Sequence, residues 1–347
     1  MALPSEANGS SSYNEGKAAE HRSLLLVSVP RTASNLLVRV LNIRNQPQVV
    51  TNSHAGYFFY QPHMIAAREL KRPPSQWTND EKARVREAYQ ESLNSIEEMR
   101  AVARRENKIM FAKEHAFWVA DPAAMPGTAG GRGARAPSFF RLRFPDMYGE
   151  QQTFSPNNCT LFPDEYLRTW RIAFVIRHPA LAWPSMYRAM VKMVDEKLLD
   201  EDGVRGASLA NMSLAWTRKM FDWALEHDPA TVPLVIDAHD VIHNPAAVRR
   251  FCELAGLDAS KVQFEWDETP VAGWQDQQDL QGAKIMCSTL EASRGLLKDK
   301  TPATVDVTTE AEKWKAEFGE EVAALVEKAV WDALPDYEYL KERRVQA

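Results

Sequence analysis

Basic and hydroxyl side chains gather where an apolar run at residues 24–29 gives way to a helical pattern that begins at Leu36. The intervening residues are Pro30, Arg31, Thr32, Ala33, Ser34 and Asn35. Ser34 or Asn35 can cap the new helix, and the free N–H groups of its first turn favour a phosphate or sulfate, beside which Arg31 adds a formal charge. The stretch is therefore either an anion site or an ordinary turn whose Ser and Asn side chains only cap the helix.

Two further segments place reactive side chains at the ends of apolar runs. One run ends in Lys113-Glu114-His115, and another ends in Arg177-His178-Pro179, with Ser185 eight residues after Arg177. In open parallel sheets the carboxyl ends of the strands face the ligand crevice, so these side chains would lie beside a bound ligand. His115 could act as a general base, and Arg177 with Ser185 could hold a phosphate. Taken singly, His115 could equally be a core histidine, Arg177 a member of a surface ion pair, and Ser185 a helix N-terminal residue.

The elements that must position these residues alternate along the chain. Helical patterns separate short apolar runs, and Thr78 or Asn79 opens a long helix that extends to about Asn107. Strands alternating with helices predict an α/β fold, with a mostly parallel sheet flanked by helices on both faces. The runs that predict buried strands are 24–29, 108–115, 171–176 and 233–237.

The last third of the chain gives weaker signals. Residues 273–309 are polar and irregular, and Arg294-Gly295 within them would suit an anion-contacting loop. A single helix is predicted over about 309–333. Aromatic side chains upstream are candidates for a substrate pocket or, more ordinarily, for core packing. They are Tyr57, Phe58, Phe59 and Trp118.

Composition limits the classes of protein that this chain can be. Its 347 residues are 45% hydrophobic and 26% charged, which predicts a mostly globular protein. We expect a polar, disordered tail over residues 1–20, and a single domain over 21–340 with a lid or insertion at about 120–165. The formal net charge of −5 argues against general nucleic-acid binding.

The cysteines and the N-terminus suggest the compartment. Cys159, Cys252 and Cys287 lie far apart without ligand-like spacing, so we expect free thiols and no metal site. The N-terminus lacks the apolar core of a signal peptide, and the run at 24–29 is too short to span a bilayer. These features predict a cytoplasmic protein without membrane contact.

Together, the reactive segments resemble the cytosolic sulfotransferases, a family of P-loop-like α/β enzymes. That family transfers a sulfuryl group from 3′-phosphoadenosine-5′-phosphosulfate (PAPS) to an acceptor hydroxyl or amine. Its donor loop is matched by residues 30–35, where Arg31 replaces the usual lysine and Ala33 the glycine. Its 3′-phosphate pair is matched by Arg177 and Ser185, and its Lys-x-His motif by residues 113–115. The long insertion between the last two motifs is more similar to sulfotransferase-like proteins of fungal type.

The resemblance implies roles for individual residues. His115 would be the general base, Lys113 and Arg31 would stabilise the transferred group, and the donor would bind to Arg31, Thr32, Ala33, Ser34, Asn35, Arg177, Ser185, Arg294 and Gly295. The acceptor would be a small, hydroxylated, apolar metabolite, and no metal is required. Three alternatives stay open: a P-loop kinase, sulfation that drives elimination or cyclisation, and a non-catalytic relative. The full Gly-x-x-x-x-Gly-Lys-Ser/Thr loop of the kinases is missing.

Overall fold

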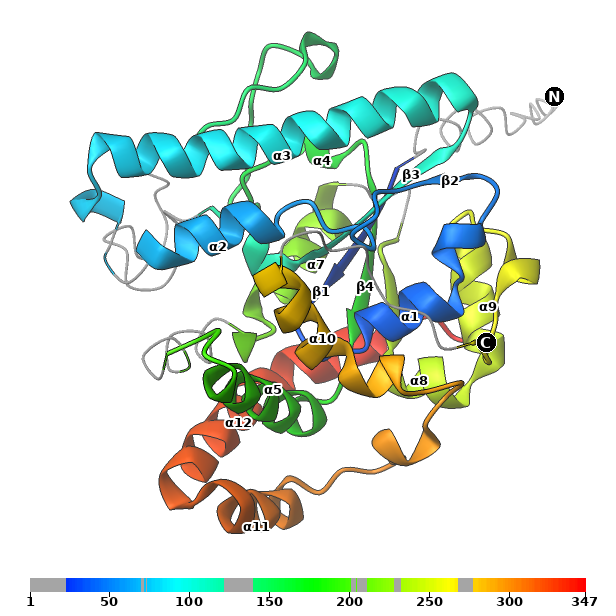
Figure 1. Cartoon of the computed structure of the whole chain (residues 1–347). Helices are drawn as coiled ribbons and strands as arrows, with labels where there is room; N and C mark the ends of the chain where they lie inside the picture. The colour runs from blue at the N-terminus through cyan, green and yellow to red at the C-terminus, as the bar shows by residue number, and fades with distance from the viewer. Residues whose placement is uncertain are drawn as a thin grey trace, which may run out of the picture.

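Five parallel strands form the sheet at the centre of the computed structural model, in the order β2-β3-β1-β4-β5 (Figure 1). The structure describes residues 23–69, 72, 74–121, 140–200, 204, 211–227, 232–267 and 277–347. The predicted tail and residues 122–139 of the predicted lid lie outside these ranges. The strands are β1 (Ser23–Ser28), β2 (Val49–Val50), β3 (Ile109–His115), β4 (Arg171–Ile176) and β5 (Leu234–Asp237).

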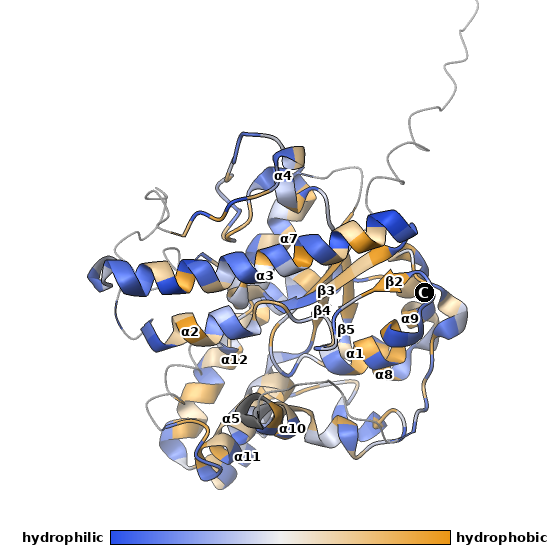
Figure 2. Cartoon of the chain, turned by 45° about the horizontal axis from the view of Figure 1, so that its top comes forward, coloured by the Kyte–Doolittle hydropathy of each residue, from blue (hydrophilic) through white to orange (hydrophobic). Residues whose placement is uncertain are grey.

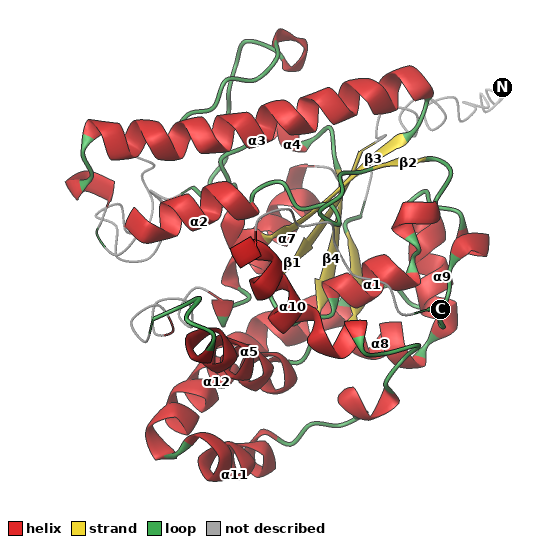
Figure 3. Cartoon of the chain, viewed as in Figure 1, coloured by secondary structure: helices red, strands yellow, loops and turns green. Residues whose placement is uncertain are grey.

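Helices cover both faces of the sheet, as predicted (Figure 3). Leu24 and Leu26 pack on one face, in a cluster with Leu37 of α1 (Ser34–Val40) and Phe251 of α9 (Pro245–Leu254). The other face carries α3 (Asn79–Glu106), α7 (Ala215–His227) and α12 (Glu320–Glu342). Hydrophilic and hydrophobic residues alternate along the ribbons of these helices (Figure 2). The α/β prediction is therefore confirmed.

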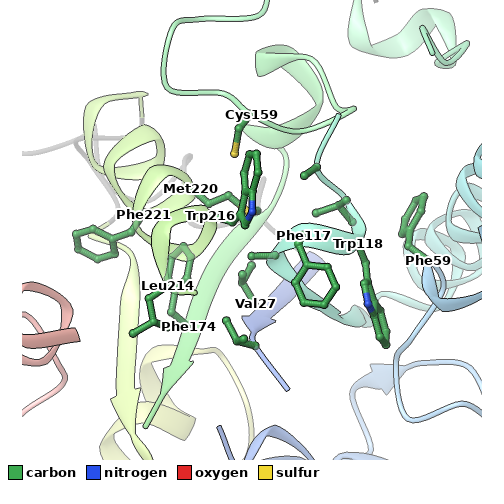
Figure 4. Close-up of a cluster of buried hydrophobic side chains, with 14 of the residues drawn as sticks. Val27, Phe59, Phe117, Trp118, Cys159, Phe174, Leu214, Trp216, Met220 and Phe221 are labelled. Atoms are coloured by element: carbon green, nitrogen blue, oxygen red, sulfur yellow. The ribbon is translucent and has the colours of Figure 1, made fainter. Parts of the chain in front are cut away.

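Aromatic side chains dominate the core beneath the second face (Figure 4). Val27 of β1 and Phe174 of β4 lie beside Trp216 of α7, and all three are buried. Cys159 reaches the same cluster from the segment 140–165, where Leu161 and Phe162 are also buried. The part of the predicted lid that the structure describes thus contributes to the core. None of the helices in the described ranges is long and apolar enough to cross a membrane.

Two residues or pairs of residues were predicted to cap helices, and the structure agrees with the prediction for α3 but not for α1. Thr78 caps α3 with a complete capping box, in which its side chain accepts from the Glu81 N–H and Glu81 accepts from the Thr78 N–H. The prediction that Ser34 or Asn35 caps α1 is wrong. The N-cap residue is Ala33, which makes no side-chain cap and has a φ of 68°. Ser34 already lies within the helix, because the tight turn after β1 consumes fewer residues than expected.

Ala33 adopts a left-handed conformation that disfavours a Cβ atom. We expect Ala33→Gly to stabilise the protein by about 0.5–1 kcal/mol, because the relief of strain outweighs the larger entropy of glycine in the unfolded chain. Chemical denaturation measures the change. Ala101→Gly, at an exposed position in α3, is the matched control and should destabilise the protein by a similar amount. Destabilisation by both substitutions would contradict the predicted strain.

The C-terminal third departs most from the sequence-based expectations. Residues 277–291, predicted to be irregular, form helix α10 (Gln277–Glu291). The single predicted helix over 309–333 is in fact two helices, α11 (Val307–Phe318) and α12. Gly319 separates them with a φ of 82°, a conformation that glycine adopts without strain. The polar composition of α10 hides its helical pattern, and the helix is held by packing on α5 and α1, which lie far away in the sequence.

Candidate active site

His115 lies at the carboxyl end of β3, beside the last residue of β1. The parallel register pairs Ser28 with His115, and the Ser28 hydroxyl oxygen lies 2.8 Å from His115 Nδ1. On the other side of the ring, the Tyr57 hydroxyl lies 3.2 Å from Nε2. Only 5% of His115 is exposed. Both ring nitrogens are therefore held by hydroxyl groups inside the protein.

The environment of His115 favours the neutral imidazole. Burial lowers its pKa well below the usual value, and the nearby Lys113 and His63 lower it further. The Trp118 ring packs edge-on against the imidazole, with 4.3 Å between the ring centroids. A neutral, oriented imidazole is the form that accepts a proton, so the site can supply a general base.

Lys113 projects from the same face of β3, two residues before His115. Its side chain is completely buried, and Nζ donates to Asn35 Oδ1 in the first turn of α1. Nζ also lies 4.0 Å from the centroid of the Tyr57 ring. Burial lowers the Lys113 pKa to about 7. The side chain is therefore a cation that titrates near neutral pH and lies between β3 and the turn after β1.

The two candidate arginines meet at the ends of β1 and β4. Arg31 Nε donates to the Ser185 hydroxyl of α5 (Pro179–Asp195) at 3.0 Å, and Arg177 donates to the Arg31 carbonyl at 3.2 Å. Arg177 also donates to the Lys300 carbonyl at 2.8 Å. Burial and the charge of Arg31 lower the Arg177 pKa to about 10, and Arg177 Nε is buried without a partner among the described residues. An anion would satisfy this nitrogen and stabilise both charges.

Helix α10 contacts Arg31 and Asn35, a feature absent from the sequence-based predictions. The Met286 carbonyl accepts a hydrogen bond from Arg31, and Asn35 Nδ2 lies 3.3 Å from Cys287 Sγ. In Figure 1, α10 lies against α1 and α5. Helix α10 is thus a further segment on the donor side of the site, beside the segments that the sequence predicted there. Nothing in the sequence indicated that Met286 and Cys287 would lie beside Arg31 and Asn35.

The other candidate residues divide between the site and its surroundings. The Thr32 hydroxyl donates to the Val29 carbonyl and shapes the turn, whereas Ser34 is buried at the start of α1. The Trp266 N–H donates to the Arg294 carbonyl, and Gly295 forms a bridge with Glu265. These contacts tie the predicted anion loop to the 264–266 segment.

Of the four aromatic candidates for the substrate pocket, two contact the His115 ring and two make other contacts. Tyr57 and Trp118 contact the His115 ring. The Phe58 N–H donates to the Glu114 carboxylate at 2.6 Å, and Phe59 packs between Tyr89 and Phe162 in the core, away from the imidazole. Two residues that reasoning from the sequence missed are Ser28 and Glu114. A polar serine inside the apolar run at 24–29 was the available signal for the first.

These observations define a class of protein: a parallel α/β fold that brings a buried histidine, a buried lysine and two arginines together at the carboxyl edge of its sheet. Across the described ranges, no three His, Cys, Asp or Glu side chains gather as metal ligands would.

Known proteins identify the family. The chain is 33% identical over 354 residues to Sulfotransferase ppzF of Metarhizium majus (strain ARSEF 297), covering 97% of this chain and 99% of that protein. It is also 33% identical over 334 residues to Sulfotransferase ppzF of Metarhizium rileyi (strain RCEF 4871), covering 93% and 96%. No family model and no solved structure matches the chain. The chain belongs to the fungal sulfotransferase-like family, and its general chemistry is sulfuryl transfer.

Proposed function

We propose that the protein transfers a sulfuryl group from PAPS to a hydroxyl group of a small, apolar acceptor. One observation carries the proposal: Arg31, Ser185 and Arg177 are joined in one cluster, next to the buried pair Lys113 and His115. The unpartnered Arg177 Nε fits a phosphate, and the aromatic rings of Tyr57 and Trp118 beside His115 fit an apolar acceptor.

The chain's residues divide the work of an in-line transfer. PAPS supplies an activated sulfuryl group with a good leaving group. Arg177 and Ser185 would hold the 3′-phosphate, while Arg31 and Lys113 would stabilise negative charge on the transferred group and the bridging oxygen. His115 would take the proton of the acceptor hydroxyl. The protein would form no covalent bond to the transferred group, so it would accelerate the reaction by positioning the reactants and stabilising charge.

A non-catalytic relative is the second candidate function, because α10 already occupies hydrogen-bonding groups of Arg31 and Asn35. Calorimetric titration separates the two. We expect 3′-phosphoadenosine-5′-phosphate to bind selectively over magnesium–ATP, since Arg177 and Ser185 favour the extra 3′-phosphate. Failure of the bisphosphate to bind would support the non-catalytic protein, and a preference for magnesium–ATP would support a kinase.

The titration of Lys113 predicts a pH dependence. Its pKa is lowered to about 7, so the side chain is a cation below that pH and neutral above it. We expect kcat/KM for the donor to fall as the pH rises above about 7, because this parameter reports groups of the free enzyme. Rate measurements between about pH 6 and pH 9 test this. Lys113→Met should lower the rate and remove the alkaline fall, and a profile that Lys113→Met leaves unchanged would exclude Lys113 as its origin.

A further inference from the structure

The hydrogen bonds of Ser28 determine which nitrogen of His115 can accept a proton. The Ser28 hydroxyl oxygen lies 3.3 Å from the Glu114 carbonyl, which can only accept, and 2.8 Å from His115 Nδ1. When Ser28 donates its single hydrogen to that carbonyl, its oxygen accepts from Nδ1, so Nδ1 carries the ring hydrogen and Nε2 presents its lone pair. The atom that faces this lone pair is the Tyr57 hydroxyl oxygen, at 3.2 Å. The Tyr57 O–H is thus the donor to Nε2.

Tyr57 also contacts the side of the site where the donor would bind. Lys113 Nζ lies 4.0 Å from the centroid of the Tyr57 ring and donates to Asn35 Oδ1 in the first turn of α1. Tyr57 thus lies between the base and the turn that leads into the arginine cluster. An acceptor hydroxyl bound beside this turn would lie next to Tyr57, whose hydroxyl oxygen lies 3.2 Å from His115 Nε2.

The Tyr57 ring is fixed from both sides. The buried Glu114 carboxylate accepts hydrogen bonds from the N–H groups of Phe58 and Phe59, at 2.6 and 3.1 Å, and so anchors the loop that carries Tyr57. Lys113 Nζ packs on one face of the ring, and Trp118 contacts the ring with 4.9 Å between centroids. An oriented hydroxyl can pass a proton without a rearrangement of the loop.

We propose that Tyr57 is a catalytic proton relay between the acceptor hydroxyl and His115. As the new acceptor O–S bond forms, the acceptor proton passes to the Tyr57 oxygen while the Tyr57 proton passes to His115 Nε2. The S–O bond to the 5′-phosphate breaks, and its electron pair leaves with the bisphosphate product. The imidazolium then returns its proton to solvent. This inference rests on the proposed function.

The test compares wild-type protein with Tyr57→Phe, using PAPS and 1-hexanol as probes, because the hydroxyl of this apolar alcohol stays protonated at neutral pH. We expect kcat to fall on the order of 100-fold in the variant, with an unchanged Kd for 3′-phosphoadenosine-5′-phosphate. In mixtures of light and heavy water, the wild-type rate should show a curved, two-proton dependence. Tyr89→Phe is the matched control, because it also removes one buried phenol hydroxyl, which donates to the Trp118 carbonyl, and it should keep the curved dependence.

Several results would overturn the relay. An equal or faster rate for Tyr57→Phe would make Tyr57 a gate that must move aside, and a sulfuryl adduct on Tyr57, detected by intact mass, would make it a covalent carrier. Nitrogen NMR of the free protein supplies a readout without donor or acceptor: we expect His115 to carry its hydrogen on Nδ1, and the Nε2 resonance to move in Tyr57→Phe. A hydrogen on Nε2 in the wild type would overturn the relay. Failure of the bisphosphate to bind wild-type protein would overturn the proposed function instead.

Discussion

Replacing His115 with alanine is expected to lower kcat by roughly 10²- to 10⁴-fold, the usual contribution of a general base. The affinity for 3′-phosphoadenosine-5′-phosphate should stay within about twofold, since Arg31, Arg177 and Ser185 make their contacts without the imidazole. The physical reason is that, in the proposed function, Nε2 would accept the proton, since the Ser28 hydroxyl lies 2.8 Å from Nδ1. Steady-state kinetics and calorimetry measure the two effects separately.

Two controls distinguish loss of the base from loss of structure. Added imidazole should restore part of the activity of His115→Ala, because the cavity left at β3 can admit a small base. His227→Ala, on α7, where the ring lies against the Trp223 carbonyl, should keep wild-type kcat. If His115→Ala retained full turnover, the assignment of the base to His115 would be wrong.

Replacing Arg177 with alanine is expected to weaken binding of 3′-phosphoadenosine-5′-phosphate by about 30- to 150-fold. This corresponds to about 2–3 kcal/mol for losing charge-assisted hydrogen bonds to a phosphate. The kcat at saturating donor should change much less, because the 3′-phosphate lies away from the reacting atoms. Calorimetric titration gives the affinity, and kinetics at saturating PAPS gives kcat.

The matched control for Arg177 is Arg188→Ala on the same helix as Ser185. The Arg188 guanidinium is bound to Glu317 and its side chain is 47% exposed, so its removal should leave nucleotide affinity unchanged. Adenosine-5′-phosphosulfate, which lacks the 3′-phosphate, should bind wild type and Arg177→Ala equally. If Arg177→Ala lost the same affinity for both nucleotides, Arg177 would not act through the 3′-phosphate, and the prediction would be wrong.

The sheet was predictable because its strands are buried on both faces. Continuous apolar runs such as residues 24–29 and 171–176 correspond to β1 and β4 within one or two residues. The long α3 was equally accessible, since its capping box and its helical spacing are both local features. The exception is β2, which pairs with β3 at the edge of the described sheet and, at two residues, is too short to leave a pattern.

The helices of the last third were predicted poorly because their signals are not local. The polar sequence of α10 hides a helix whose Met286 and Cys287 contact Arg31 and Asn35, which lie about 250 residues earlier. The break between α11 and α12 depends on the left-handed conformation of Gly319, in a run that otherwise favours helix. Tertiary contacts overrode weak local preferences at both positions.

By itself, the sequence determined the α/β class, the family and the positions of Arg31, Lys113, His115, Arg177 and Ser185 at strand and helix ends. It could do so because strand burial and the motifs depend on neighbouring residues. Only the tertiary structure decided that Ser28 and Tyr57 hold the two nitrogens of His115, that Arg177 supports the loop of Arg31, and that α10 covers both Arg31 and Asn35. These contacts join residues far apart in the chain, and strand register and helix packing, which no local pattern encodes, set their geometry.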